Sequence, residues 1–193
     1  RESEPERPFH SMCLALVFLT QLHDCWEYED QNWLSRAGEA ARTMMTQLPE
    51  ATGSRLLLAR VLLQDVARRQ EGLALLKGSP SAARETSVFS LVMSFAALIE
   101  GDAEACVRLR DNVREGSPLH PLLSLFRVET AMALFFAGRN QEALDQAREG
   151  LAVFPAQSGL MVIFLAVTGA LPDDMLSDDL AAELADIRQR LAW

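Results

Sequence analysis

Apolar residues recur at helical spacing along most of the chain. Between short breaker segments, most stretches have apolar side chains at positions i, i+3, i+4 and i+7, which places them on one face of a helix. No run alternates β-branched residues around an Asn-Gly or Asp-Gly turn, as the strands of a hairpin would. The pattern therefore predicts an all-α protein, with helices over residues 9–23, 31–48, 54–67, 69–77, 84–100, 102–115, 119–137, 139–153, 158–170 and 176–191.

Small residues relate these helices to one another. Aligning residues 70–73 (QEGL) with 141–144 (QEAL), and 100–103 (EGDA) with 137–140 (AGRN), brings four small side chains into register at separations of 35, 34 and 37 residues: Ala37, Gly72, Cys106 and Ala143. A period near 34 with two helices per period is typical of stacked helical hairpins. A small residue lets the two helix axes of a hairpin approach to about 8–10 Å. We interpret the four positions as equivalent helix crossings.

Glycine and proline mark the ends of the repeated helices. Gly101 and Gly138 precede the second helix of two hairpins, where the backbone must reverse. A proline follows the small residue by 12 positions in three repeats, at Pro49, Pro118 and Pro155. Proline lacks an N–H and disfavours helix at the residue before it, so each proline ends a second helix. After Gly72 the proline comes early, at Pro80, and we expect that second helix to be short.

Two segments resemble tetratricopeptide repeats. One is 124–155, with Ala131, Leu134, Gly138, Ala143, Gly150 and Pro155; the other is 87–118, with Ser94, Ala97, Gly101, Cys106 and Pro118. Residues 53–80 and 18–49 match more weakly, and 158–191 is a candidate terminal hairpin. The chain departs from the family in lacking the Trp near the start of the first helix and the Tyr after the small residue. The resemblance implies a right-handed superhelix of about five antiparallel helix hairpins, forming a single domain over 9–193 after a linker or disordered end at 1–8.

The resemblance also implies a binding groove, because the first helix of each tetratricopeptide repeat lines the concave face. The positions it assigns to that face are all apolar: Val88, Leu91, Phe95 and Leu98 in one repeat, and Leu125, Val128, Met132 and Phe135 in the next. The opposite stripes of the same helices are apolar too, so these helices must be buried on all sides or covered by a partner. An uncovered stripe of roughly a few hundred Å² would be a binding site. We expect an amphipathic helix or an extended apolar peptide as the partner; alternatively, tight superhelical curvature or the N-terminal segment fills the groove.

Composition and charge exclude several function classes. The 193 residues are 49% hydrophobic and carry 18 basic against 27 acidic side chains, for a formal charge of −9. This balance disfavours direct contact with nucleic acid, which needs Lys and Arg to replace counterions. The longest apolar stretches, 12–19 and 159–171, fall short of the roughly 20 residues of a membrane span. Cys13, Cys25 and Cys106 show no CxxC spacing, and we read them as reduced thiols.

Residues with candidate chemistry are few. The chain has no GxGxxG, GxxxxGK, HExxH or GxSxG motif. His23-Asp24-Cys25 lacks a second ligand group at metal spacing. We interpret the acidic residues before and in the first turn of the last helix as caps rather than calcium ligands: Asp173, Asp174, Asp178 and Asp179. The sequence thus predicts no catalytic residue, no metal and no cofactor.

The function expected is that of a non-catalytic protein–protein interaction module. The alternatives are a small-molecule-sensing domain, with an apolar cavity bounded by Phe95, Met132 and Phe135, and a homo-oligomerisation domain such as a homodimer. Of the 18 basic residues, 17 are Arg, which favours a GC-rich bacterial source. Similar domains form the C-terminal part of bacterial regulators with a winged-helix domain, and serve as chaperones or assembly factors of secretion systems. The missing initial Met favours such a C-terminal module in the bacterial cytoplasm, or in the periplasm if a membrane span precedes residue 1.

Overall fold

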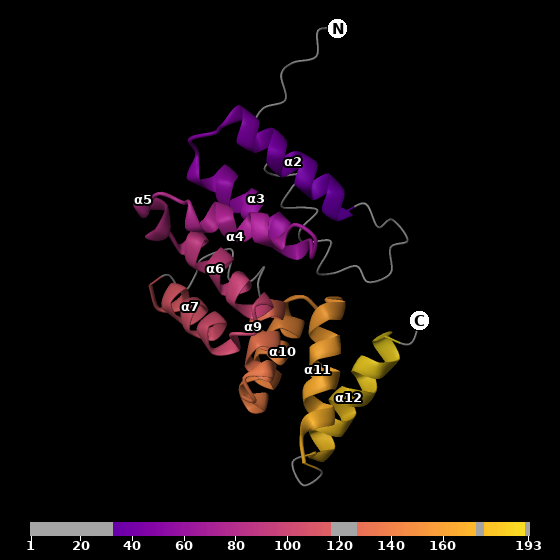
Figure 1. The fold of residues 1–193 in the computed structure, drawn as a ribbon. Coiled ribbons are helices and arrows are strands. Elements are labelled where there is room, and N and C mark those ends of the chain that lie inside the picture. Colours follow the sequence, from indigo (N-terminus) through magenta and orange to yellow (C-terminus); the bar gives the residue numbers. More distant parts are fainter. Residues whose placement is uncertain (1–32, 117–126, 173–175, 192–193) are drawn as a thin grey trace, which may run out of the picture. The chain divides into compact units, whose positions relative to one another are not determined.

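A computed structural model describes residues 33–116, 127–172 and 176–191. This part of the chain contains helices and no strand (Figure 1). The helices are α2 (Trp33–Gln47), α3 (Thr52–Gln64), α4 (Arg69–Lys77), α5 (Ser81–Arg84), α6 (Ser87–Ile99), α7 (Ala103–Gly116), α9 (Arg127–Phe136), α10 (Asn140–Val153), α11 (Ser158–Ala170) and α12 (Asp178–Leu191). The predicted all-α class is confirmed. The helix predicted at 9–23, the start of the one at 119–137 and the expected linker at 1–8 lie outside the described residues.

Two predicted helix boundaries are wrong, each because a short polar side chain bonds the local backbone. The helix expected over 54–67 ends at Gln64, since Asp65 leaves helical geometry and its carboxylate accepts a hydrogen bond from the Ala67 N–H at 3.0 Å. The helix expected over 84–100 is divided into α5 and α6. Thr86 is extended, with φ −86° and ψ 144°, and its hydroxyl accepts from the Phe89 N–H as the N-cap of α6.

The cap of the last helix also differs from the prediction. Asp178 and Asp179 lie in the first turn of α12 as expected, where their charge complements the helix dipole. The hydroxyl of Ser177, however, accepts the hydrogen bond from the Leu180 N–H at 3.2 Å. Asp173 and Asp174 lie outside the described residues. The cap is thus a serine, and the aspartates contribute through charge.

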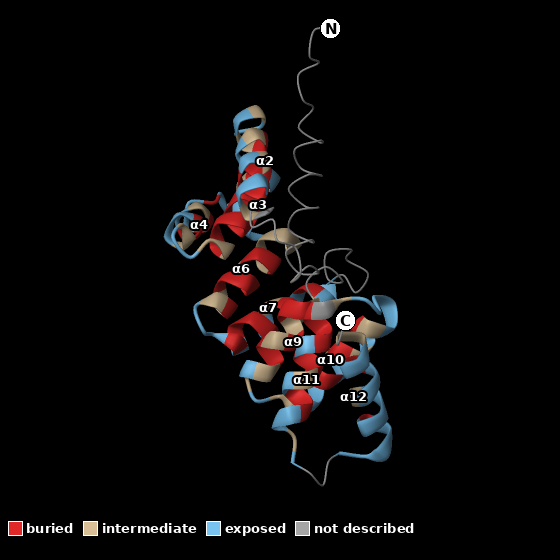
Figure 2. Cartoon of the chain, turned by 90° about the vertical axis from the view of Figure 1, so that its right-hand side faces the viewer, coloured by how far each residue is buried: buried red, intermediate tan, exposed pale blue. Residues whose placement is uncertain are grey.

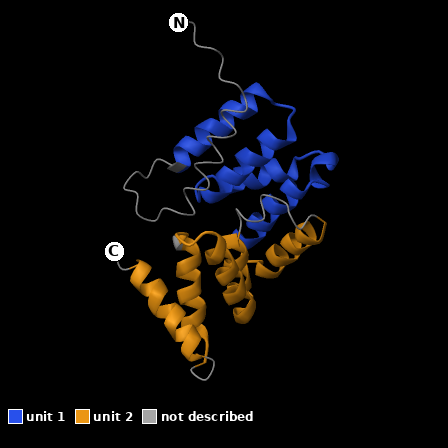
Figure 3. Ribbon diagram, turned by 180° about the vertical axis from the view of Figure 1, so that it is seen from behind, with its two compact units in different colours: residues 1–100 blue, residues 101–193 orange. Residues whose placement is uncertain are grey.

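The chain forms two compact units, residues 1–100 and 101–193 (Figure 3). In the first unit α3 packs against α2, α4 and α6. In the second unit α9 packs against α7, α10 and α11, and α11 also packs against α10 and α12. Most consecutive helices of a unit therefore contact each other, as stacked hairpins require. The expectation of a single domain over 9–193 stays a prediction.

The four small residues of the repeat are all buried. At Gly72 the reason is visible: a Cβ atom there would lie 3.0 Å from the Ala59 carbonyl oxygen and 3.1 Å from the Leu63 nitrogen, both backbone atoms of α3. The prediction that a small residue permits close approach is confirmed at this crossing. The second helix of this hairpin, α4, is short as predicted, with nine residues against 14 in α7 and α10.

The hairpin glycines adopt the backbone conformation that their position requires. Gly101 and Gly138 have φ values of +87° and +73°, a region that L side chains rarely adopt. After α9 the Arg139 N–H donates to the Leu134 carbonyl at 2.9 Å and the Gly138 N–H to the Phe135 carbonyl at 3.0 Å. This pair of bonds is a Schellman motif, and it directs the chain from α9 into α10.

Burial is uneven among the helices (Figure 2). In α3, nine of the 13 residues are buried, whereas in α12 only Leu180 and Ile187 are. The first unit holds two apolar clusters, one between α2 and α3 and one that joins α3 and α4 to α6. None of the helices described here is both long and apolar enough to cross a membrane.

Candidate functional site

The residues predicted to line a groove are more covered than an open groove would require. On α6, Leu91, Phe95 and Leu98 are buried, and Val88 is half-buried. On α9, Val128 is buried while Met132 and Phe135 are half-buried, and Leu125 lies outside the described residues. None of the seven described members is exposed. Their role as a groove stays a prediction.

Contact with α3 buries part of the predicted groove surface of α6. Phe95 and Val88 pack in the cluster that includes Leu56 and Leu63 of α3. The guanidinium carbon of Arg60, also on α3, lies 3.6 Å from the centroid of the Phe95 ring, a cation–π contact. The Phe95 side chain thus serves the core of the first unit.

Helix α11 presents the apolar surface that α6 does not. Moving the α9 positions 128, 132, 135 and 136 forward by 34 residues gives 162, 166, 169 and 170. All four are exposed, and we call them the α11 face: Val162, Ala166, Gly169 and Ala170. Their spacing of i, i+4, i+7 and i+8 places them on one stripe of the helix. Sequence reasoning missed this set because it read 158–191 only as a terminal hairpin, although the same 34-residue step was available.

The rest of α11 anchors the helix in the core. Leu160, Phe164 and Val167 are at most 1% exposed, and the helix contacts α9, α10 and α12. Gly150 of α10 lets Leu160 approach, since a Cβ atom there would overlap the Leu160 side chain. The Thr168 hydroxyl donates to the Phe164 carbonyl at 2.8 Å, so it needs no outside partner. The α11 face is therefore presented by a firmly packed helix.

Further exposed apolar side chains occur on the helices that pack against α11. Phe136 at the end of α9 is 65% exposed, and Val153 and Phe154 at the end of α10 are 59% and 44% exposed. No charged residue occurs between Glu149 and Asp173, so α11 and the connection before it are uncharged throughout. The arrangement suits contact with an apolar, uncharged surface, since a charged group facing it would lose hydration without gaining a partner.

Two ion pairs of this unit involve residues at or on α10. Arg148 of α10 bonds Glu183 of α12 at 2.8 Å. Arg139 and Glu142 pair at 2.6 Å at the start of α10. The hydrogen bond from Arg139 lowers the pKa of Glu142, and the same bond raises the pKa of Arg139. Both effects stabilise the charged pair that fixes the first turn of α10.

The described residues contain no group of three or more His, Cys, Asp or Glu side chains placed to hold a metal ion. His10, His23, Cys25 and His120 lie outside them, so the sequence interpretation of these residues stays a prediction. Cys106 is buried in α7.

Comparison with solved structures identifies the fold. A mutant form of MamA matches with a TM-score of 0.53 and 15% identity, over 96% of this chain and 96% of that one. MamA AMB-1 matches with the same TM-score and identity, over 94% of this chain and 97% of that one. MamA is an all-helical, tetratricopeptide-like protein. The chain has a tetratricopeptide-like helical fold. No protein-family model matches the chain, and no curated protein sequence does.

Proposed function

We propose that this chain is a non-catalytic protein-interaction module that docks a short apolar helix or extended apolar segment of another protein on the α11 face. The observation that carries the proposal is the exposure of Val162, Ala166 and Gly169, which lie one repeat beyond the predicted groove residues Val128, Met132 and Phe135, together with exposed Ala170 on the same stripe. The tetratricopeptide resemblance supports it, because that family binds partners along the first helix of each repeat.

The side chains of the α11 face indicate the chemistry of the partner. Three of the four are Gly or Ala, so the surface is shallow and the partner's backbone can come close. The large side chains that fill such an interface must then come from the partner, as Leu, Ile, Met or Phe at helical spacing. On the helices that pack against α11, Phe136 of α9 and Val153 of α10 are larger apolar residues that are also exposed.

The cellular setting belongs to the same proposal. An acidic, Arg-rich and Lys-poor composition supports a bacterial source, and we infer that the module belongs to a larger regulatory or secretion-assembly protein of the cytoplasm. The partner is a protein segment and not nucleic acid, since the formal charge of −9 opposes binding to phosphates.

A displayed library of helical peptides tests the proposal. Peptides enriched on the chain should be apolar on one face and should bind at least about tenfold more weakly to Val162→Asp and Ala166→Arg, because a buried unpaired charge at an anchor costs more than about 1.4 kcal/mol. Ala182→Arg, at an exposed alanine of α12, is the matched control and should bind normally. Equal binding by all variants, or no enrichment, would refute the docking face.

Light scattering distinguishes a foreign partner from a second copy. A monomeric wild-type chain agrees with the proposal. A dimer that Val162→Asp converts to monomer would instead make the α11 face a self-association surface, as in the homo-oligomer alternative. Neither result depends on knowing the natural partner.

A further inference from the structure

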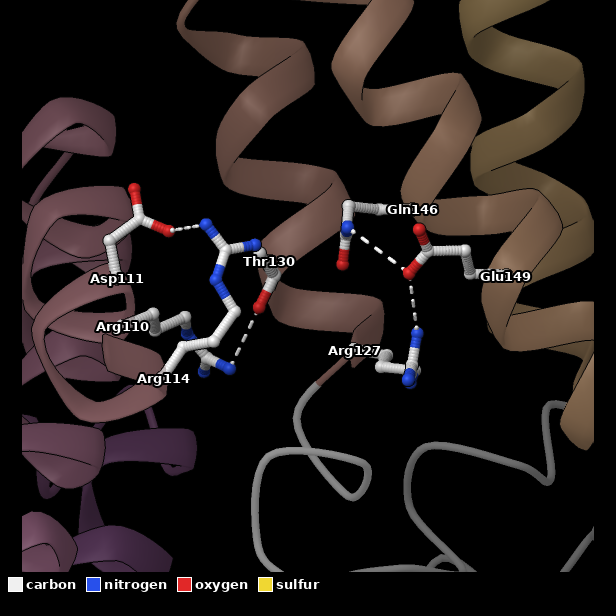
Figure 4. Close-up of a pocket in the computed structure, with 7 residues that line it drawn as sticks. All are labelled: Arg110, Asp111, Arg114, Arg127, Thr130, Gln146 and Glu149. Carbon is white, nitrogen blue, oxygen red and sulfur yellow. Dashed lines mark hydrogen bonds and ion pairs between the residues drawn. The ribbon is translucent and has the colours of Figure 1, made fainter. Parts of the chain in front are cut away.

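A second candidate site lies in the unit 101–193 and is polar. A pocket of about 110 Å³ opens between α7, α9 and α10, and three guanidinium groups line it: Arg110 and Arg114 from α7, and Arg127 from α9 (Figure 4). We call it the guanidinium pocket. All its described lining residues are charged or carry a hydroxyl or amide. Two carboxylates, Asp111 and Glu149, line it as well, so three positive charges face two negative ones around this cavity, in a chain that is acidic as a whole.

One of these arginines is held rigidly. The guanidinium of Arg110 forms an ion pair with Glu129 of α9, and both side chains are only 3% exposed. The same guanidinium donates to the Thr130 hydroxyl at 3.0 Å. Because the Arg110 guanidinium is buried and interacts with both Glu129 and Thr130, it cannot turn away from the cavity. Arg110 therefore lines the cavity in a fixed position and orients the Thr130 hydroxyl beside it.

The other two arginines are held loosely. Arg114 pairs with Asp111, three residues earlier on α7, at 2.8 Å, and Arg127 pairs with Glu149 of α10 at 3.2 Å. Each pair includes a side chain about 60% exposed, and exposed pairs of this kind contribute little because water screens them. An arriving anion can therefore take the place of either carboxylate.

Arg127 also has a donor that the described residues leave unused. Its Nε atom is buried, and no acceptor among the described residues bonds it. A buried donor without an acceptor is unfavourable, and guanidinium groups satisfy such donors by binding planar oxyanions through two parallel hydrogen bonds. The amide of Gln146, which lines the same pocket, adds a neutral donor.

We propose that the guanidinium pocket binds a small oxyanion, either a carboxylate or a phosphate group. Arg127 and Arg114 bind its oxygens, Gln146 donates a further hydrogen bond, and the Arg110–Glu129 pair keeps the wall in place. The pocket volume accommodates a group of this size and a few waters. This site is distinct from the α11 face and does not depend on the function proposed for it.

Nuclear magnetic resonance of the arginine Nε–H groups tests the proposal on the whole chain. Inorganic phosphate and N-acetylglycine are titrated separately at constant ionic strength. A saturable shift of the Arg127 signal is expected with at least one of them, and the ligand that gives it distinguishes phosphate from carboxylate. Arg127→Gln and Arg114→Gln should each weaken binding at least tenfold.

The matched control is Arg190→Gln, which removes the same charge from an exposed pair on α12. It should leave the affinity unchanged. Shifts that never saturate, or an equal loss of affinity in Arg190→Gln, would mean an adventitious ion only and would overturn the proposal. Because Arg114 and Arg127 are tested separately, misfolding of one variant leaves the other to decide.

Discussion

Replacing Gly72 by alanine tests whether a small residue is required where α4 crosses α3. Alanine stabilises a helix by about 1 kcal/mol relative to glycine, so local propensity favours the change. Against this, the new Cβ would stand 3.0 Å from the Ala59 carbonyl oxygen, 3.1 Å from the Leu63 nitrogen and 3.2 Å from the Leu62 Cβ. Two of these are backbone atoms of a packed helix and cannot turn aside. Overpacking of this kind costs about 1–3 kcal/mol, and we expect a net loss of about 1 kcal/mol.

Gly53→Ala is the matched control for this substitution. Gly53 is also helical, in the first turn of α3, but nothing lies within 4 Å of its added Cβ. There alanine should stabilise the chain by up to about 1 kcal/mol. Urea unfolding followed by circular dichroism measures both variants, and the two should differ by about 2 kcal/mol with opposite signs. If Gly72→Ala stabilises as much as Gly53→Ala, the close crossing is wrong.

Buried and exposed contacts elsewhere in the chain give four further expected outcomes. Phe95→Ala should lower the free energy of unfolding by about 3–5 kcal/mol, because the Phe95 ring is buried. Phe136→Ala changes an exposed ring and should lower the free energy of unfolding by less than about 1 kcal/mol. Equal, small losses for the two variants would instead favour an open groove at α6. Glu129→Leu should cost about 3–5 kcal/mol by leaving the buried Arg110 charge uncompensated, and urea unfolding should show most of this recovered when Arg110→Met is added. The pKa of Glu142 is lowered in the folded chain, so the unfolded chain binds a proton at this carboxylate more readily than the folded chain does. The Arg139–Glu142 pair therefore stabilises the fold at neutral pH, and this stabilisation is lost as the pH falls through the folded pKa of Glu142. Glu142→Gln should remove this part of the acid dependence, which is at most about 0.5 kcal/mol for an exposed pair, when the free energy of unfolding is measured across the acid range. Circular dichroism should report more than half helix, in agreement with the described helices, and a value below half would contradict the fold.

Local signals in the sequence were sufficient for most of the fold. The predicted bounds of α4 and α11 agree with the structure, and a breaker segment marks the end of each helix, 77–81 (KGSPS) for α4 and 170–174 (ALPDD) for α11. Gly101 and Gly138 have the positive φ that their place before a second helix required. The errors at Asp65 and Thr86 arose because a side-chain hydrogen bond to the backbone decides those boundaries, and apolar periodicity carries no information about such bonds.

The candidate sites were less predictable, since they depend on contacts between helices. A helix that is apolar on all sides, such as α6 or α11, does not reveal which side its neighbours cover. Phe95 is 9% exposed because Arg60 and the α3 residues pack on it, whereas Val162 of α11 is 37% exposed. The guanidinium pocket likewise joins residues such as Arg127 and Glu149 that are 22 positions apart, a pairing that sequence spacing alone does not specify.

Solvent exposure of the α11 face, with and without a peptide, tests the central claim most directly. A soluble paramagnetic agent accelerates the relaxation of methyl protons that water reaches. In the free chain, the methyl groups of Val162 and Ala166 should relax several-fold faster than those of Val167, which is fully buried in the same helix. Saturation with a selected apolar helical peptide should slow the relaxation of Val162 and Ala166 and leave exposed Ala182 of α12 unchanged. Two results would contradict the account. One is that the methyl protons of Val162 relax as slowly as those of Val167 in the free monomer; the other is that the bound peptide leaves the relaxation of the Val162 methyl protons unchanged.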